Sequence, residues 1–314
     1  MKIFNDLKEI TKPFKNGVIT LGNFDGVHKG HQVLMDKLND KAKEIDGVSI
    51  AITFDPHPAR FFNKGERLPL ITLDEQKVEL LEKTGLDVLI CIPFTESFAS
   101  IAATEFIEDI LVKRIGMKAI IVGKDYTFGK DRHGTIELLK EYAKGLDFEV
   151  IVSGWINAPG TDESRISSTR IRNIITEGRV DRAMELLGRY YQIRGKVETG
   201  RKRGGRLLGF PTANINLQDE LCPKTGVYAV TVECCNEKYK GVANIGYSPT
   251  FDDNIFTVEV HIFDFDDEIY EQNIRVNFVQ RLRDEKKFSD ISDLIEQINR
   301  DCIKARDILS ENSV

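Results

Sequence analysis

Short apolar runs alternate with helix-like segments throughout the first half of the chain. The runs are rich in β-branched residues and cover residues 17–21, 48–54, 87–92, 118–122 and 148–152. Segments with helical spacing of apolar residues lie at 31–45, 104–115, 134–145, 167–177 and 180–187. Because the runs are apolar throughout, they indicate strands that are buried on both faces. This order of elements favours an α/β fold, with a parallel sheet covered by helices on both sides.

The pattern changes after about residue 188. Strand-like segments there alternate in polarity or carry β-branched residues, and Gly, Pro and Asn separate them; they cover 191–197, 227–234, 239–245, 256–263 and 274–278. Such strands predict a small antiparallel barrel or sandwich. The amphipathic segment 290–309 predicts a closing α-helix. Its apolar face is expected to contain Ile291, Leu294, Ile295, Ile298, Cys302 and Ile303. We therefore expect two domains, 1–186 and 187–314.

Composition narrows the choice of partner and compartment. The net charge of −6 argues against nucleic acid or an anionic membrane as the main partner. No apolar run approaches the roughly 20 residues of a spanning helix. The N-terminal stretch has acidic residues early and no uninterrupted apolar core, so it does not resemble a secretory signal. The five cysteines form no CxxC pair, which indicates reduced thiols and a cytoplasmic protein.

A glycine-rich segment with two histidines follows the first predicted strand. Residues 19–32 read ITLGNFDGVHKGHQ. Glycines allow a backbone to approach a phosphate chain closely, and ligands of open α/β sheets bind beside such strand ends. His28 and His31 are three residues apart at a helix start, so both can donate hydrogen bonds to one ligand. This arrangement suits attack of a phosphate on the α-phosphorus of ATP, although a glycine-rich turn with surface histidines is the plainer alternative.

A second segment, residues 165–172 (RISSTRIR), is expected to contact the same phosphates as the two histidines. Ser168 and Thr169 would open a helix, where hydroxyls and free N–H groups attract anions. Arg170 and Arg172 can neutralise phosphate charge. An ordinary helix cap is the alternative for this segment taken alone.

Together, GNFDGVHKGHQ, ISSTRIR, TFDPHP at 53–58 and GKDYTFG at 123–129 resemble the adenylyltransferase half of prokaryotic bifunctional riboflavin kinase/FAD synthetases. The resemblance implies a Rossmann-like nucleotidylyltransferase domain in which His28, His31 and Arg170 are catalytic. It implies ATP-binding roles for Gly22, Asn23, Phe24, Asp25, Ser168 and Thr169. It implies flavin-binding roles for Phe54, Pro56, His57, Pro58 and Asp125. For His57, a rigid exposed loop between two prolines is the alternative.

A basic, glycine-rich segment marks the second predicted domain. Residues 200–214 read GRKRGGRLLGFPTAN. Its glycine N–H groups and cations can wrap phosphates, which makes ATP-binding candidates of Arg201, Gly204, Gly205 and Arg206. A solvated basic loop is the alternative. Thr212 and Asn214 offer oxygen ligands on one side of an extended strand, where ATP phosphates could complete the shell of Mg²⁺.

Phosphorylation of an alcohol also needs a carboxylate that accepts the hydroxyl proton. Glu259 lies within an apolar strand pattern, where a carboxylate is costly unless it is used or paired. A solvent-facing strand residue is the alternative.

The segments RGGRLLGFPTANI, GVYAV, GVANIG, PTF and VEVHIFDFDDEIY resemble the riboflavin kinase module in order and spacing. The resemblance implies a six-stranded antiparallel β-barrel, Thr212 and Asn214 as metal ligands, and Glu259 as the base that activates the ribityl hydroxyl. Glu271 stands where the family usually has glycine after Tyr270, so we expect a turn of different shape there.

Three hypotheses follow. The first is a bifunctional enzyme that converts riboflavin and ATP to FMN and then FMN and ATP to FAD, with Mg²⁺ as the metal. The second is a weakly catalytic flavin- or nucleotide-binding regulator on the same fold, and the third is a transferase for another phosphorylated vitamin. The third explains the two histidines but not PTAN. Nucleic acid and membrane are not expected as partners, and transient self-association is left open.

Overall fold

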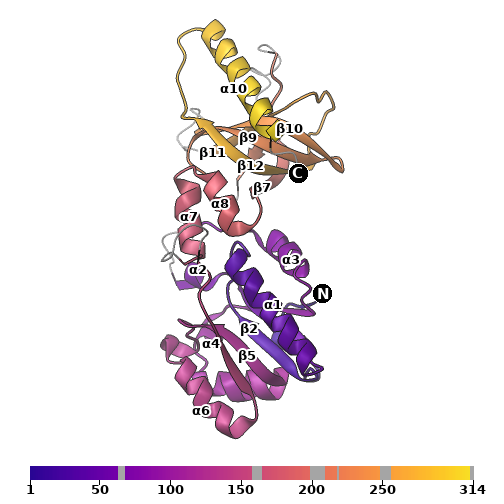
Figure 1. Cartoon of the computed structure of the whole chain (residues 1–314), viewed down its shortest axis with the longest axis vertical. Coiled ribbons are helices and arrows are strands. Elements are labelled where there is room, and N and C mark those ends of the chain that lie inside the picture. Colours follow the sequence, from indigo (N-terminus) through magenta and orange to yellow (C-terminus); the bar gives the residue numbers. More distant parts are fainter. Residues whose placement is uncertain (63–67, 158–164, 199–208, 218, 248–255, 312–314) are drawn as a thin grey trace. The chain divides into compact units, whose positions relative to one another are not determined.

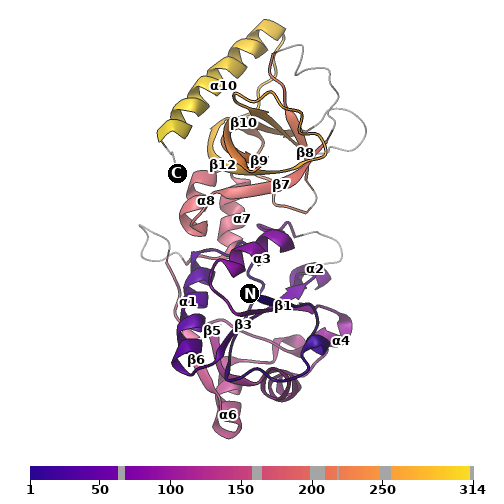
Figure 2. The same cartoon turned by 90° about the vertical axis from the view of Figure 1, so that its right-hand side faces the viewer.

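The chain forms two compact units. The computed structural model describes residues 1–62, 68–157, 165–198, 209–217, 219–247 and 256–311. Close contacts group residues 1–68 and 72–167 into the first unit, and residues 69–71 and 168–314 into the second. Figure 1 and Figure 2 show the elements of both units, which we describe one at a time.

The first unit contains a six-stranded parallel sheet. Its strands are β1 (Lys2–Phe4), β2 (Gly17–Leu21), β3 (Val48–Asp55), β4 (Val88–Pro93), β5 (Met117–Gly123) and β6 (Glu149–Ser153). Their order in the sheet is β1-β4-β3-β2-β5-β6, and every pair is parallel. The predicted parallel sheet is confirmed. Strand β1 was not predicted, because it has three residues of which only Phe4 is buried.

Helices cover both faces of this sheet, as predicted. Its α-helices are α1 (Lys29–Glu44), α2 (Pro58–Phe62), α3 (Asp74–Glu82), α4 (Glu96–Ala99), α5 (Ala103–Glu105) and α6 (Ile136–Leu146). The π-helix η2 (Phe106–Ile115) continues α5, and η1 (Leu7–Glu9) and η3 (Lys130–Arg132) are 3₁₀ turns. Side chains on one face, such as Ile19 and Ile50, pack with η2 and α6. Those on the other face, such as Val18 and Ala51, pack with α1 and α3.

The second unit begins with α7 (Ser168–Thr176) and α8 (Val180–Leu187), which precede a closed barrel. The barrel strands are β7 (Tyr191–Glu198), β8 (Ala213–Asn216), β9 (Gly226–Cys234), β10 (Glu237–Tyr247), β11 (Phe256–Ile262) and β12 (Asn273–Arg283). They close in the order β10-β11-β8-β7-β12-β9 with antiparallel pairing. The barrel is confirmed, and its six strands include β8, a short strand that comes directly after Thr212.

The closing helix α10 (Ile291–Glu311) is present, but its predicted apolar face is partly wrong. Ile291 and Ile303 are 65% and 63% exposed. The buried residues are Asp301, Ala305 and Leu309, spaced four apart. Spacing alone missed this stripe because one of its members is a carboxylate: Asp301 accepts hydrogen bonds from Arg283 Nε on β12, at 3.1 and 2.9 Å.

The turn after Tyr270 keeps a conformation that favours glycine. Glu271 has φ 65°, in the left-handed region that L-residues adopt at a cost. Its carboxylate forms an ion pair with Lys196, which helps to hold the turn.

The helices of the described residues include none with both the length and the apolar character that a membrane span requires.

We predict that Asp301→Ala destabilises the second unit by about 2–3 kcal/mol, because Arg283 would lose its partner at a largely buried position. Urea denaturation can separate the two units, since the only tryptophan, Trp155, reports the first. The far-UV circular dichroism transition should move to lower urea while the tryptophan fluorescence transition stays in place. Asp307→Ala, an exposed position of the same helix, is the matched control. Equal shifts in both variants would contradict the prediction.

Candidate active sites

The loop after β2 is strained and tightly anchored. Phe24, Gly26 and Val27 have φ values of 48°, 83° and 37°, a conformation that is costly for the two non-glycine residues. Phe24 is only 1% exposed, so its ring fixes the loop against the core. A Cβ atom on Gly22 would lie 2.9 Å from that ring, which explains why glycine starts the loop. The loop thus has a fixed shape.

Asp25 has a structural role that the sequence did not predict. It is buried, and it accepts a hydrogen bond from the backbone N–H of Thr72 at 3.1 Å. The Thr72 hydroxyl in turn accepts from the N–H of Gly26 at 3.0 Å. These bonds tie the glycine-rich loop to the segment that leads into α3. Asp25 therefore shapes the loop, whether or not it also contacts ATP.

His28 and His31 lie together at the start of α1. His28 is the N-cap residue, and its Nδ1 accepts a hydrogen bond from the backbone N–H of His31 at 3.3 Å. The two imidazole rings stack, with centroids 3.6 Å apart and planes 16° apart. The ring of Phe24 meets His31 edge-on at 5.3 Å. A Cβ atom on Gly30 would lie 3.1 Å from the His28 ring, so glycine leaves room for the stack.

The charge state of the pair follows from this packing. Burial, and then the nearby His28, hold the pKa of His31 well below its ordinary value, so His31 is neutral near pH 7. Its Nδ1 is buried and has no hydrogen-bond partner within the described part of the chain. Because Nδ1 of His28 accepts a hydrogen bond, its Nε2 is the nitrogen that carries a proton. The pair can therefore donate N–H groups to an anion without placing two positive charges side by side.

The predicted flavin residues follow β3. A cis peptide bond joins Asp55 to Pro56, and α2 begins at Pro58. His57 caps this helix, since its Nδ1 accepts a hydrogen bond from the N–H of Ala59 at 3.1 Å. The capping contact is a structural role for His57.

Phe54 belongs to a group of aromatic rings that sequence reasoning did not identify. It lies 5.7 Å from both Phe94 and Phe98, and Phe61 and Phe62 lie 5.3 and 5.7 Å from Phe94. Phe62 is 65% exposed. The rings come from three segments, so no sequence window reveals them as a group. They form an edge-to-face aromatic cluster near the carboxyl ends of β3 and β4.

Asp125, two residues after β5, forms an ion pair with Arg165 at 2.8 Å. The Arg165 guanidinium lies over the ring of Trp155 at 3.9 Å from its centroid. Sequence reasoning missed both partners because they flank a long connection after β6. The pairing leaves Asp125 charge-compensated rather than free to bind a cation.

The remaining predicted phosphate ligands of the first reaction lie in the second unit. Helix α7 begins at Ser168, as predicted from the sequence, and Thr169 and Arg170 occupy its first turn. Thr169 is exposed, and Ser168 and Arg170 are half-buried.

A row of polar side chains crosses the outer face of the barrel. Glu259 on β11 pairs with Asn214 on β8 and with Asn244 on β10, so the three side chains point outward together. Their neighbours Ile215, Val258 and Ile245 point into the core. Burial of its carboxyl by surrounding atoms raises the pKa of Glu259, although the residue as a whole is exposed.

Thr212 precedes β8 and lies on the same side of the chain as Asn214. The segment before it is held to β11, since His261 Nδ1 lies 2.9 Å from the carbonyl oxygen of Pro211, and its ring meets Phe210 edge-on. Within the described residues no group of three or more His, Cys, Asp or Glu could hold a metal by itself. Thr and Asn oxygens suit a hard cation such as Mg²⁺ only when phosphate oxygens complete its shell, and this donor set fits that case.

Sequence reasoning missed Asn244 and Glu285 in this row. A Cβ atom on Gly246 would lie 2.2 Å from Glu285 Oε1 and 3.5 Å from Asn244 Nδ2, so both groups cover the same outward spot. Arg201, Gly204, Gly205 and Arg206 lie outside the described residues.

Known proteins match the chain along its length. Residues 10–170 match a family model described as FAD synthetase, and residues 187–309 match one described as riboflavin kinase. A bifunctional riboflavin kinase/FMN adenylyltransferase of Buchnera aphidicola is 37% identical over 96% of both chains. The Escherichia coli K12 protein of the same description is 34% identical over 98% of this chain and 97% of its own.

A solved structure described as a macrolide-efflux protein from Streptococcus pneumoniae is also similar. It is 36% identical, has a TM-score of 0.86, and matches 95% of this chain and 96% of its own. Since both halves match their family models in succession and the relatives align over nearly their whole lengths, the chain belongs to the family of bifunctional riboflavin kinase/FMN adenylyltransferases.

Proposed function

We propose that the second unit phosphorylates riboflavin to FMN and that the first adenylylates FMN to FAD, each with ATP. The stacked pair His28 and His31 carries the proposal for the first reaction. The pair lies at the carboxyl end of β2. From β2 the chain adds β3 on one side of the sheet and β5 on the other, so the direction in which strands are added reverses beside β2. Open α/β sheets bind ligands at such a point.

In the first reaction an oxygen of the FMN phosphate attacks the α-phosphorus of ATP, and pyrophosphate leaves. The attacking phosphate is already an anion, so no side chain has to remove a proton. His28 and neutral His31 would donate hydrogen bonds to the phosphate oxygens as negative charge shifts toward pyrophosphate. The loop residues Gly22, Asn23 and Phe24 would wrap the phosphates. Ser168, Thr169 and Arg170 remain our candidates for further ATP contacts, on the resemblance of their segment to the family.

We assign the flavin to the aromatic surface after β3. The ring of Phe54, beside Phe94 and Phe98, offers the apolar flat contact that an isoalloxazine ring system requires. Pro56, His57 and Pro58 would form the rigid border of this surface. Asp125, held by Arg165, would accept a hydrogen bond from the substrate.

In the second reaction Glu259 accepts the proton of the ribityl hydroxyl. The hydroxyl oxygen attacks the γ-phosphorus of ATP, and ADP leaves. The raised pKa of Glu259 makes it a stronger base than an ordinary carboxylate. Thr212 and Asn214 would hold Mg²⁺, which would neutralise the ATP phosphates when bound. Arg201, Gly204, Gly205 and Arg206 remain our candidates for further ATP contacts.

We also propose 1–186 and 187–314 as the functional domains, because the riboflavin kinase match begins at residue 187. All five cysteines are free thiols, which fits reactions in the reducing cytoplasm, where ATP is supplied.

We predict that His28→Ala lowers the rate of FAD formation by about 10²–10³-fold, because a hydrogen-bond donor to the reacting phosphates is lost. FMN formation from riboflavin should not change. Two assays, one started with riboflavin and one with FMN, each contain ATP, and chromatography quantifies the FMN and FAD that form. The control is His133→Ala, which removes an exposed imidazole. FAD formation at the wild-type rate in His28→Ala would refute the role of this residue.

Glu259→Gln should have the opposite effect. It keeps the shape of the side chain but cannot accept a proton, so FMN formation should fall by about 10²–10⁴-fold. FAD formation from supplied FMN should persist. Glu237→Gln, an exposed change on β10, is the control. Loss of both activities in a folded Glu259→Gln protein would show that the two reactions are not separable.

The pH dependence gives a further test of Glu259. Only its ionised form can accept a proton, so the kcat/KM for FMN formation, which reports groups of the free enzyme, should fall as the pH drops through its pKa. Burial raises that pKa, so the fall should be centred above about 4.3, the value of a free glutamate. The pH profile of kcat/KM should show this acid limb in the wild type and lack it in Glu259→Gln. An identical limb in both proteins would assign it to another group.

A further inference from the structure

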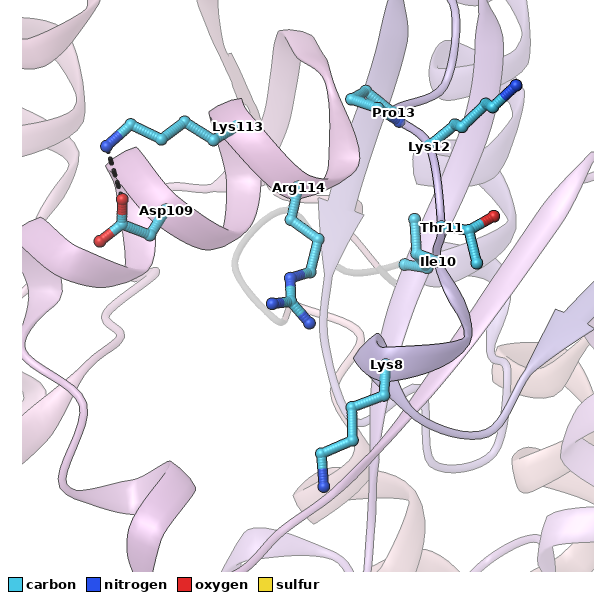
Figure 3. Close-up of a pocket in the computed structure, with 8 residues that line it drawn as sticks. All are labelled: Lys8, Ile10, Thr11, Lys12, Pro13, Asp109, Lys113 and Arg114. Atoms are coloured by element: carbon cyan, nitrogen blue, oxygen red, sulfur yellow. Dashed lines mark hydrogen bonds and ion pairs between the residues drawn. The ribbon is translucent and has the colours of Figure 1, made fainter.

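A basic hollow lies in the first unit, away from the residues discussed so far. Its volume is about 490 Å³, and it is lined by Lys8, Ile10, Thr11, Lys12, Pro13, Asp109, Lys113 and Arg114 (Figure 3). The hollow joins the segment that leads into β2 to the last two turns of η2. A volume of this size is within the range of small-molecule sites.

The charges of the hollow are unbalanced. Its only carboxylate, Asp109, pairs with Lys113 at 2.6 Å. In the described part of the chain, Lys8, Lys12 and Arg114 have no ion-pair or hydrogen-bond partner for their charged groups. In Figure 3 the side chains of Arg114 and Lys8 extend into the same open space, whereas Lys12 points away from it.

Nearby carboxylates do not neutralise these cations. Asp6 caps η1 by accepting a hydrogen bond from the backbone N–H of Lys8 at 2.8 Å. Glu9 accepts one from the N–H of Asn5 at 3.1 Å. In a chain with a net charge of −6, two cations that share one hollow without counter-charge require an explanation.

The hollow is separate from the proposed adenylyltransferase site. Two backbone bonds, from Phe14 to Ile115 and from Gly17 to Gly116, hold its walls together where β2 and β5 begin. His28 and the glycine-rich loop follow the opposite, carboxyl end of β2. Because β2 and β5 are parallel, the hollow lies at the amino ends of these strands and the proposed adenylyltransferase site at their carboxyl ends.

We propose that the hollow binds a small polyphosphate anion with at least two adjacent phosphate groups. Arg114 can hold one phosphate through two parallel N–H bonds, and Lys8 can act as a point charge on the next. Free diphosphate belongs to this class, and the site does not depend on the proposed function of either unit.

The test is hydrogen exchange of the full chain with and without pyrophosphate at low salt, read out by peptide mass spectrometry. Pyrophosphate should slow exchange in residues 8–13 and 109–114. The double variant K8Q/R114Q should lose this protection, with at least tenfold weaker binding there. It should keep any protection of residues 22–31, which reports the adenylyltransferase site separately. Since the charged groups of Lys8 and Arg114 have no partner among the described residues, the variant should fold, and its tryptophan fluorescence checks this.

The matched control is K83Q/K140Q, which removes two exposed lysines of the same unit outside the hollow. It should retain the protection of 8–13 and 109–114. Absence of that protection in the wild type would overturn the proposal. An equal loss of protection in both double variants would also overturn it, because it would indicate a general, salt-screened attraction of pyrophosphate to positive charge. Orthophosphate that binds as tightly as pyrophosphate would overturn the requirement for adjacent phosphates.

Discussion

Burial of the parallel sheet on both faces is the constraint on which the first unit depends. Strands such as β3, with Ile50, Ala51 and Ile52 fully buried, offer no face that a ligand could reach in the middle of the sheet. Chemistry is therefore confined to the strand ends. Because all strands run the same way, the loops after β2, β3, β5 and β6 all emerge on the side of the sheet where the carboxyl ends of the strands lie. The histidines, the aromatic surface and Asp125 all follow from this restriction.

The start of α1 shows how one contact can serve structure and chemistry together. A helix N-terminus has unpaired N–H groups and attracts anions. His28 satisfies one of these groups, because its Nδ1 accepts a hydrogen bond from the backbone N–H of His31. The same cap brings the ring onto His31, whose burial keeps it neutral. Strain at Phe24 and Val27 is tolerated because Asp25 and Thr72 hold the loop from behind.

Much of this could be predicted from the sequence, because periodicity reports burial. The strands β2 to β6, the barrel strand β11 and the helix α8 followed from apolar spacing, and the histidine pair followed from a motif at a strand end. What could not be predicted depends on contacts between distant residues. The bond between Asp25 and Thr72, and the approach of Glu285 to Gly246, join segments that no local pattern relates. On α10 the buried Asp301 disguised the packed stripe, because its partner Arg283 lies on another element.

The two units handle an incoming oxygen differently, and the difference follows from the acidity of the nucleophile. A phosphate monoester is ionised near neutral pH, so a site for FMN needs donors that receive charge, and the pair His28 and His31 is our proposed source of them. An alcohol keeps its proton until it reacts, so the site for riboflavin needs a base. We propose that this base is Glu259, a barrel carboxylate whose pKa is raised by burial. The placement of Glu259 on the outer face also explains why the barrel core stays apolar: Val258 and Val260 on either side of it complete the interior while the carboxylate stays with Asn214 and Asn244 outside.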